Sequence, residues 1–144
     1  MIADEALSWR PRHPTDLLQT VGVLRRGGGD PAFARDASRS VWRATRTVDG
    51  VATIRLSQPS GDELRCEGWG PGAAAAVAQA PELLGDRDDP SGFDPGLPLL
   101  DDAHRRNPGI RIARSTQVFE ALAAAILEQK VITMQAHDSW RRLV

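Results

Sequence analysis

Regular alternation of apolar and polar residues marks the middle of the chain's first half. Residues 41–47 and 51–57 alternate in this way on either side of Asp49-Gly50, a pair typical of tight hairpin turns. A second turn at 59–62 leads to residues 63–68, which alternate again. The side chains expected on the inner face are Ala52, Ile54, Leu56, Leu64 and Cys66. The pattern predicts an antiparallel meander with one face against a core and the other in solvent.

Apolar residues at helical spacing occur before and after this predicted sheet. Residues 15–26 predict a helix capped by Thr15 and ended by the glycines of 27–29. An alanine-rich segment that ends at Gln79 predicts a helix with Pro71 near its first turn, and a short helical piece is expected at 82–84. Helices that follow a sheet on one chain favour an α+β fold.

The rest of the chain is predicted to be a loop and three helices. Residues 85–96 are acidic and rich in glycine and proline, which is typical of a surface loop, and 97–106 predict a short helix. A helix is expected to begin near Ser115 or Thr116, and a second follows over 131–144. The first has a broad apolar stripe that we expect to be buried: Val118, Phe119, Leu122, Ala125 and Ile126. The second has no stop signal, so we expect this chain to be a fragment of something longer.

Composition limits the class of protein. A chain of 144 residues with 41% hydrophobic residues is enough for one domain with a core. No apolar run approaches the roughly 18 to 20 residues of a membrane span, and the start is acidic, so a cytoplasmic location is expected. Cys66 is the only cysteine and the three histidines are scattered, so no metal site is expected.

Charge by itself does not predict a nucleic-acid partner. The chain has 18 basic and 19 acidic residues, for a formal net charge of −1, and all but one of the basic residues are arginine. The concentrated positive charge expected of a DNA-binding protein is therefore absent. Arg35, Arg39, Arg43 and Arg46 fall in or near the predicted sheet, where we interpret them as a solvated strand face in preference to a basic edge.

Two stretches resemble a known family. Residues 107–131, NPGIRIARSTQVFEALAAAILEQKV, resemble the entry to the helical domain of DNA-3-methyladenine glycosylase II, a member of the helix-hairpin-helix superfamily. Residues 7–11, LSWRP, resemble the opening strand of that family. The resemblance implies a TATA-binding-protein-like antiparallel sheet with helices over residues 1–110. Residues 111–144 would be the first two helices of an all-helical glycosylase domain, whose hairpin and catalytic aspartate lie past residue 144.

The resemblance also implies an activity and site residues. Members of this base-excision-repair family bind double-stranded DNA, flip out a damaged base and hydrolyse its N-glycosidic bond without metal or cofactor. The match places Gln129, Lys130 and Thr133 at the DNA and Val23 at the wall of the base pocket. Lys130 takes the place of an apolar wedge, so a contact with a phosphate or the orphaned base is expected there. No catalytic residue falls within this chain, which is expected to be inert on its own.

Each of these residues also has an ordinary structural interpretation. Gln129 and Lys130 are equally typical of a solvated helix end, where a cation is favourable beside the carboxyl-terminal dipole. Asp138 is expected to form a surface pair with Arg141 or Arg142. The four tryptophans, Trp9, Trp42, Trp69 and Trp140, are expected in the core.

Three hypotheses follow for the whole chain. It is the amino-terminal part of a repair glycosylase, an α+β module that binds DNA without cutting it, or a protein-interaction domain. If the partner helices are absent, the apolar stripe must be covered by self-association or left as an exposed patch.

Overall fold

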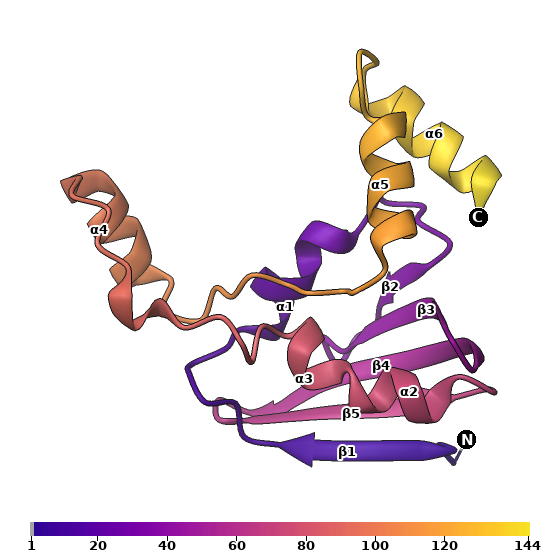
Figure 1. Cartoon of the computed structure of the whole chain (residues 1–144), viewed down its shortest axis with the longest axis horizontal. Coiled ribbons are helices and arrows are strands. Elements are labelled where there is room, and N and C mark those ends of the chain that lie inside the picture. The colour runs from indigo at the N-terminus through magenta and orange to yellow at the C-terminus, as the bar shows by residue number, and fades with distance from the viewer. Residues whose placement is uncertain (1) are drawn as a thin grey trace.

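Five strands form one antiparallel sheet in the order β1-β5-β4-β3-β2 (Figure 1). The computed structural model describes residues 2–144 and is α+β. The strands are β1 (Glu5–Trp9), β2 (Phe33–Arg35), β3 (Val41–Thr47), β4 (Gly50–Ser60) and β5 (Glu63–Trp69). Strands β3, β4 and β5 confirm the predicted meander, with Val41 opposite Leu56 and Leu56 opposite Cys66. The chain start adds β1 beside β5, where Leu7 pairs with Cys66.

The sheet buries one face under three short helices. These are α1 (Leu17–Val21), α2 (Ala73–Ala78) and α3 (Ala80–Leu83). The five side chains predicted to face inward, from Ala52 to Cys66, are at most 4% exposed. Helix α2 lies directly on β5, because a methyl group at Gly68 would lie 2.7 Å from Val77. Apolar burial between this face and these helices forms the core of the protein.

The first helix differs from its prediction at both ends. Asp16, and not Thr15, is the cap: its Oδ1 accepts a hydrogen bond from the backbone N–H of Gln19. The Thr15 hydroxyl donates instead to the carbonyl of His13. The α-helix ends at Val21 and continues as a 3₁₀ turn, η1 (Gly22–Leu24), after which Arg25 is extended.

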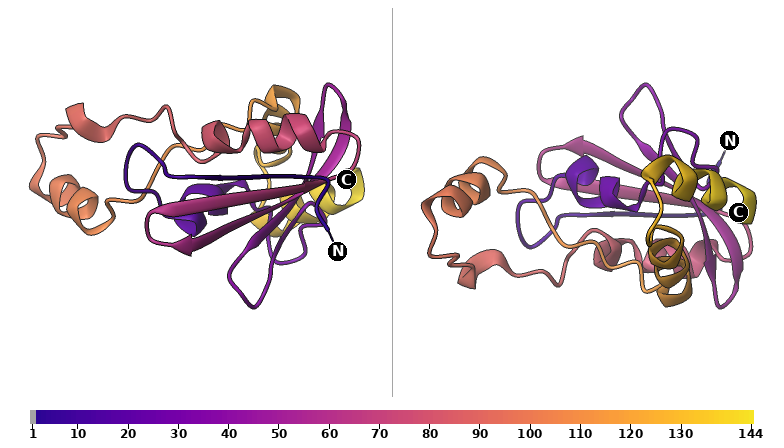
Figure 2. Two further views of the ribbon diagram at one scale, coloured as in Figure 1. Left: turned by 90° about the horizontal axis from the view of Figure 1, so that it is seen from below. Right: turned by 90° about the horizontal axis from the view of Figure 1, so that it is seen from above.

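The segment between α3 and α5 (Val118–Leu127) forms an arm. It contains a 3₁₀ turn, η2 (Pro90–Gly92), and helix α4 (Pro98–Arg106), none of whose residues is buried. Figures 1 and 2 show α4 projecting from the rest of the molecule. Asp88 closes the base of the arm, because its carboxylate accepts a hydrogen bond from the N–H of Ile112 at 2.9 Å. The buried guanidinium of Arg111 donates to the carbonyl of Pro14 and fixes the return of the chain.

Helices α5 (Val118–Leu127) and α6 (Thr133–Leu143) pack together at the end of the molecule opposite α4 (Figure 2). The expected burial of the α5 stripe is wrong. Val118 is 77% exposed, Phe119 83% and Leu122 55%, and Ala124 is the buried residue of this helix. The stripe has the predicted helical spacing, but no other described element covers it. Within residues 2–144, no helix has the length and apolar character needed to cross a bilayer.

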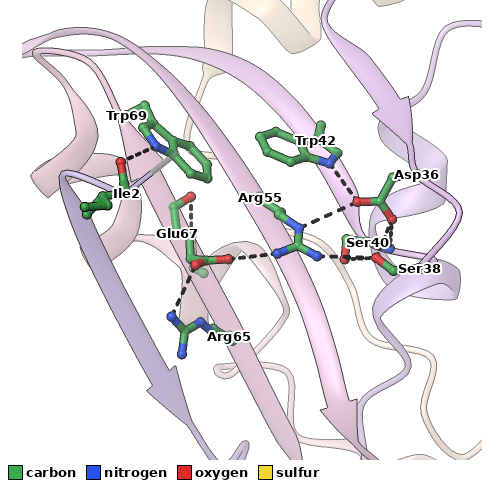
Figure 3. Close-up of polar contacts among 10 residues, drawn as sticks. Ile2, Asp36, Ser38, Ser40, Trp42, Arg55, Arg65, Glu67 and Trp69 are labelled. Atoms are coloured by element: carbon green, nitrogen blue, oxygen red, sulfur yellow. Dashed lines mark hydrogen bonds and ion pairs between the residues drawn. The ribbon is translucent and has the colours of Figure 1, made fainter.

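Two of the four tryptophans lie outside the core. Trp42 and Trp69 stack on the outer face of the sheet, with ring centroids 5.2 Å apart and planes at 20° (Figure 3). Arg55 lies between Asp36 and Glu67 and 5.8 Å from the Trp42 ring. Alternation places these side chains opposite the buried ones, so the prediction of core positions for Trp42 and Trp69 is wrong. Trp9 packs against the core and Trp140 is buried beside Asp30.

Candidate functional site

The turn between α5 and α6 carries the residues that the sequence singled out. Helix α5 ends at Leu127, and Gln129 donates its N–H to the carbonyl of Ile126. Lys130 then adopts a left-handed backbone, with φ of 57°, before α6 begins at Thr133. This conformation costs a residue with a side chain roughly 1–2 kcal/mol relative to the right-handed region. Gln129, Lys130 and Thr133 are all exposed, so the turn presents its side chains to solvent.

Val23 lies in η1 and is 65% exposed. Arg26 connects this segment to the turn. Its Nη1 donates to the carbonyl of Val23 at 3.4 Å and lies 3.4 Å from Oε1 of Glu128, the residue before Gln129. The fold therefore brings together two sites, Val23 and the 129–133 turn, that lie more than a hundred residues apart in the sequence.

Apolar side chains surround the turn. Those with large exposed fractions are Ile126 at 56%, Val131 at 44%, Ile132 at 61% and Met134 at 72%. Lys130 forms no ion pair with any residue in the described part of the chain, 2–144. A flexible cation among apolar side chains suits a partner whose surface carries negative charge next to apolar groups. The backbone and stacked bases of nucleic acid have this character.

Arg43 was interpreted as part of a solvated strand face, and this interpretation is wrong. Its side chain is 5% exposed and points from β3 toward α5, where Nη2 lies 2.6 Å from Oε1 of Glu120. Strand alternation does place Arg43 on the same face as Val41. A buried guanidinium needs a carboxylate partner, and Glu120 supplies it from 77 residues away. The pair fixes the start of α5 against the sheet.

Other parts of the molecule offer less for chemistry. A hollow of about 730 Å³ lies between the β3–β4 turn, α2 and the start of α5, but none of the predicted site residues lines it. Burial, and secondarily the charge of Glu67, raises the pKa of the Cys66 thiol to about 12, which makes it a poor nucleophile. In the described residues, 2–144, no three His, Cys, Asp or Glu side chains are grouped so as to hold a metal ion. Asp138 pairs with Arg141, as expected.

Comparison with known proteins identifies solved structures with a similar fold. No protein-family model and no curated protein matches the sequence. Among solved structures, the 3-methyladenine DNA glycosylase from Archaeoglobus fulgidus matches with a TM-score of 0.68 and 18% identity, over 91% of this chain and 47% of that one. A structure described as MBOgg1 in complex with low affinity DNA ligand matches with a TM-score of 0.57 and 18% identity, over 94% of this chain and 45% of that one.

These matches establish a DNA-glycosylase fold over nearly the whole chain, which spans less than half the length of either solved structure. The coarse α+β expectation is therefore confirmed. The TATA-binding-protein-like assignment, the domain boundary near residue 110 and the alkylated-base family stay predictions, as do the site roles of Val23, Gln129, Lys130 and Thr133.

Proposed function

We propose that this chain is the amino-terminal part of a base-excision-repair DNA glycosylase that hydrolyses the N-glycosidic bond of alkylated bases. The glycosylase fold supports the proposal, and so does the resemblance of residues 107–131 to the alkylated-base family. The observation that carries it is the exposed turn with Gln129 and Lys130 at the tip of a helix pair, joined by Arg26 to Val23.

In this proposal the turn faces duplex DNA at the position of the flipped nucleotide. Lys130 contacts a phosphate or the orphaned base, and Gln129 and Thr133 supply hydrogen-bonding groups beside it. The apolar side chains of Val131 and Ile132 lie next to the opened base step. Val23 forms one wall of the base pocket. Without an aromatic ring there, stacking on the base weakens by roughly 1–3 kcal/mol.

Cleavage itself belongs to residues that these 144 do not include. Glycosylases stabilise an oxocarbenium-like transition state with a carboxylate held in a desolvated site. The proposal assigns that aspartate and the DNA-gripping hairpin to polypeptide beyond residue 144, in a protein of the cytoplasm and nucleoid. The coverage of the two solved structures, 47% and 45%, is consistent with this division. The hydrolysis requires no metal or organic cofactor, and the chain alone is expected to release no base.

Binding to abasic duplex at several salt concentrations tests the proposal. Fluorescence anisotropy with a duplex that contains a tetrahydrofuran abasic analogue should give a Kd that rises with salt. Lys130→Ala should weaken binding. It should also reduce the slope of log Kd against log salt by about 1, the value expected for one lost phosphate contact. Arg105→Ala on α4 removes one charge at the other end of the molecule and should leave the slope unchanged. Equal Kd and equal slopes for wild type and Lys130→Ala would refute the role of the turn, and a weaker Kd with an unchanged slope would assign Lys130 to the orphaned base.

The exposed stripe of α5 favours a second candidate, a protein-interaction module. Val118, Phe119 and Leu122 form an apolar surface of the kind that monomeric proteins seldom expose. If this is the function, the chain self-associates or binds a protein partner and shows no salt-dependent DNA affinity. Sedimentation velocity of wild type and Phe119→Glu, beside the DNA titration, separates the two candidates.

A further inference from the structure

Helices α5 and α6 lie outside the main hydrophobic core. The core cluster consists of side chains from the sheet and from the helices up to Leu84, and it contains no residue of α5 or α6. Three residues of the helix pair are buried and apolar, namely Ala124, Ala136 and Trp140. Two of them are alanines, which bury little area. Besides the burial of the Trp140 ring, specific polar contacts therefore help to fix where the 129–133 turn lies.

Asp30 makes the most extensive of these contacts. It is 9% exposed, and its Oδ2 accepts the backbone N–H of Arg26 at 2.7 Å. Its Oδ1 accepts the N–H of Ala32 at 3.0 Å and the indole Nε1–H of Trp140 at 3.1 Å. The last bond joins the loop after η1 to α6 across 110 residues, and both partners are buried. A carboxylate that accepts three N–H groups away from water makes strong hydrogen bonds.

The glycines beside Asp30 allow the loop backbone to lie against α6. Gly27 has φ of 82°, and a methyl group there would lie 2.5 Å from Nδ1 of His137. A methyl group at Gly29 would lie 3.3 Å from the Arg141 side chain. The loop therefore contacts α6 directly through its backbone. The same loop begins with Arg26, which reaches Glu128 at the end of α5.

We infer that Asp30 is a positioning residue for the proposed DNA contact: through Trp140 and Arg26 it holds the α5–α6 turn, with Lys130, at a fixed place relative to Val23. The inference rests on the proposed function for its DNA-binding consequence. Its geometric consequence is independent of DNA, because it concerns the distance between α1 and α6 in the free protein.

Two variants disrupt these contacts, one of them nearly isosteric (Asp30→Asn) and the other with a smaller ring (Trp140→Phe). Asp30→Asn keeps one acceptor oxygen and loses the other, so Trp140 and the N–H of Arg26 are not both satisfied. Trp140→Phe removes the indole donor and keeps an aromatic ring. Asp49→Asn, in the exposed turn between β3 and β4, is the matched control that removes a carboxylate elsewhere.

The geometric test is an electron-spin distance measurement between nitroxides at Gln19→Cys on α1 and Gln135→Cys on α6. Both sites are exposed, whereas Cys66 is buried and does not take the label. We expect one narrow distance in the parent and in Asp49→Asn. Asp30→Asn and Trp140→Phe should each broaden or shift it, and the double variant should fall short of the sum of the two, because both act on hydrogen bonds of the same Asp30 carboxylate. An unchanged narrow distance in both variants would overturn the inference.

The functional test uses the tetrahydrofuran duplex with the full chain. Asp30→Asn should raise Kd about three- to tenfold, as expected for about one lost hydrogen bond, while the slope against salt stays that of wild type. A smaller slope would mean that phosphate contacts, and not positioning, were lost, and would count against the inference. A shifted distance with unchanged Kd would also overturn it. If wild type binds no DNA, the proposed function fails, and the distance measurement alone decides whether Asp30 places the helices.

Discussion

Arg43 of β3 and Glu120 of α5 form an ion pair with Nη2 and Oε1 2.6 Å apart, and the arginine side chain is 5% exposed. This pair joins the sheet to the first of the two closing helices. The carboxylate is 35% exposed and therefore partly screened by water, so its removal costs less than that of a fully buried partner.

Truncating this pair should destabilise the fold. Glu120→Ala leaves a buried guanidinium without its carboxylate and is expected to lower the free energy of unfolding by about 1–3 kcal/mol. Urea unfolding followed by circular dichroism measures it. Asp102→Ala on α4, which also removes a carboxylate from an arginine pair, should change the free energy by less than about 0.5 kcal/mol because it is a surface pair. Equal effects of the two variants would contradict the buried role of Arg43.

Leu56 tests the core beneath the helices. It is fully buried on β4, with Val41 and Cys66 as its cross-strand neighbours. Leu56→Ala should cost about 2–5 kcal/mol through lost burial and a residual cavity. Val48→Ala, at a site that is 99% exposed, should cost less than about 0.5 kcal/mol. The same urea titrations provide both values, and a small loss for Leu56→Ala would mean that this face is not the core.

Asp36, on the outer face of the sheet, should make the stability of the fold depend on pH. Hydrogen bonds from Ser38 and then from Trp42 lower its pKa from 3.8 to about 2. A carboxyl with a depressed pKa in the folded state stabilises the fold above its unfolded pKa, and this contribution disappears as the pH falls from about 4 to about 2. Asp36→Asn should therefore show a smaller loss of stability over that window than wild type. Urea unfolding at pH 5, 4 and 3 measures the difference, and Asp49→Asn should retain the wild-type pH dependence.

Cys66 should be inert in the folded protein. Its side chain is buried on β5, and its pKa is raised to about 12, so the reactive thiolate is scarce at pH 8. A thiol reagent such as dithionitrobenzoate should react only as fast as the protein opens, and promptly in 8 M urea. Ser8→Cys, an exposed position on β1, should add one thiol that reacts at once. Rapid reaction of native Cys66 would mean that the sheet opens readily at β5.

Local patterns predicted the sheet well, because alternation and turn residues act over a few positions. Strands β3 to β5 lie where the alternation indicated. Strand β2 was not predicted: it is three residues long, too short for an alternating pattern to be recognised. The cap at Asp16 was assigned to its neighbour because both residue types accept the same hydrogen bond.

What covers a side chain was harder to predict, because it depends on residues distant in sequence. The period of the α5 stripe showed that one face is apolar, but period alone does not reveal whether another element packs on it. Alternation placed Arg43 on the inner face, but its charge favoured a solvent-exposed position. The structure shows that Glu120 pairs with it there. The size of Trp42 and Trp69 led to the prediction that they lie in the core. Their strand positions place them on the opposite face of the sheet, where they stack on each other.

The candidate site was likewise predicted only where a local sequence pattern marks it. The sequence indicated the 129–133 turn and Val23 through resemblance, and the structure places both on the surface. The sequence did not indicate Arg26 or Asp30, the two residues that connect Val23 and its neighbours to the 129–133 turn and α6. Each makes its decisive contact with a residue about a hundred positions away, and no short motif records such a contact.

Asp88 and Ile112 close the base of the arm, while α4 beyond them buries nothing. Residues 90–106 therefore form a long excursion whose two ends are fixed by contacts outside it, because Asp89 pairs with His13 and the Gly109 carbonyl accepts the N–H of Asp16. The strand register and the α5–α6 turn impose no length on it, so insertions, deletions or a grafted epitope are tolerated there at little energetic cost. In an evolving gene, this is the stretch where relatives of the protein would be expected to differ most in length.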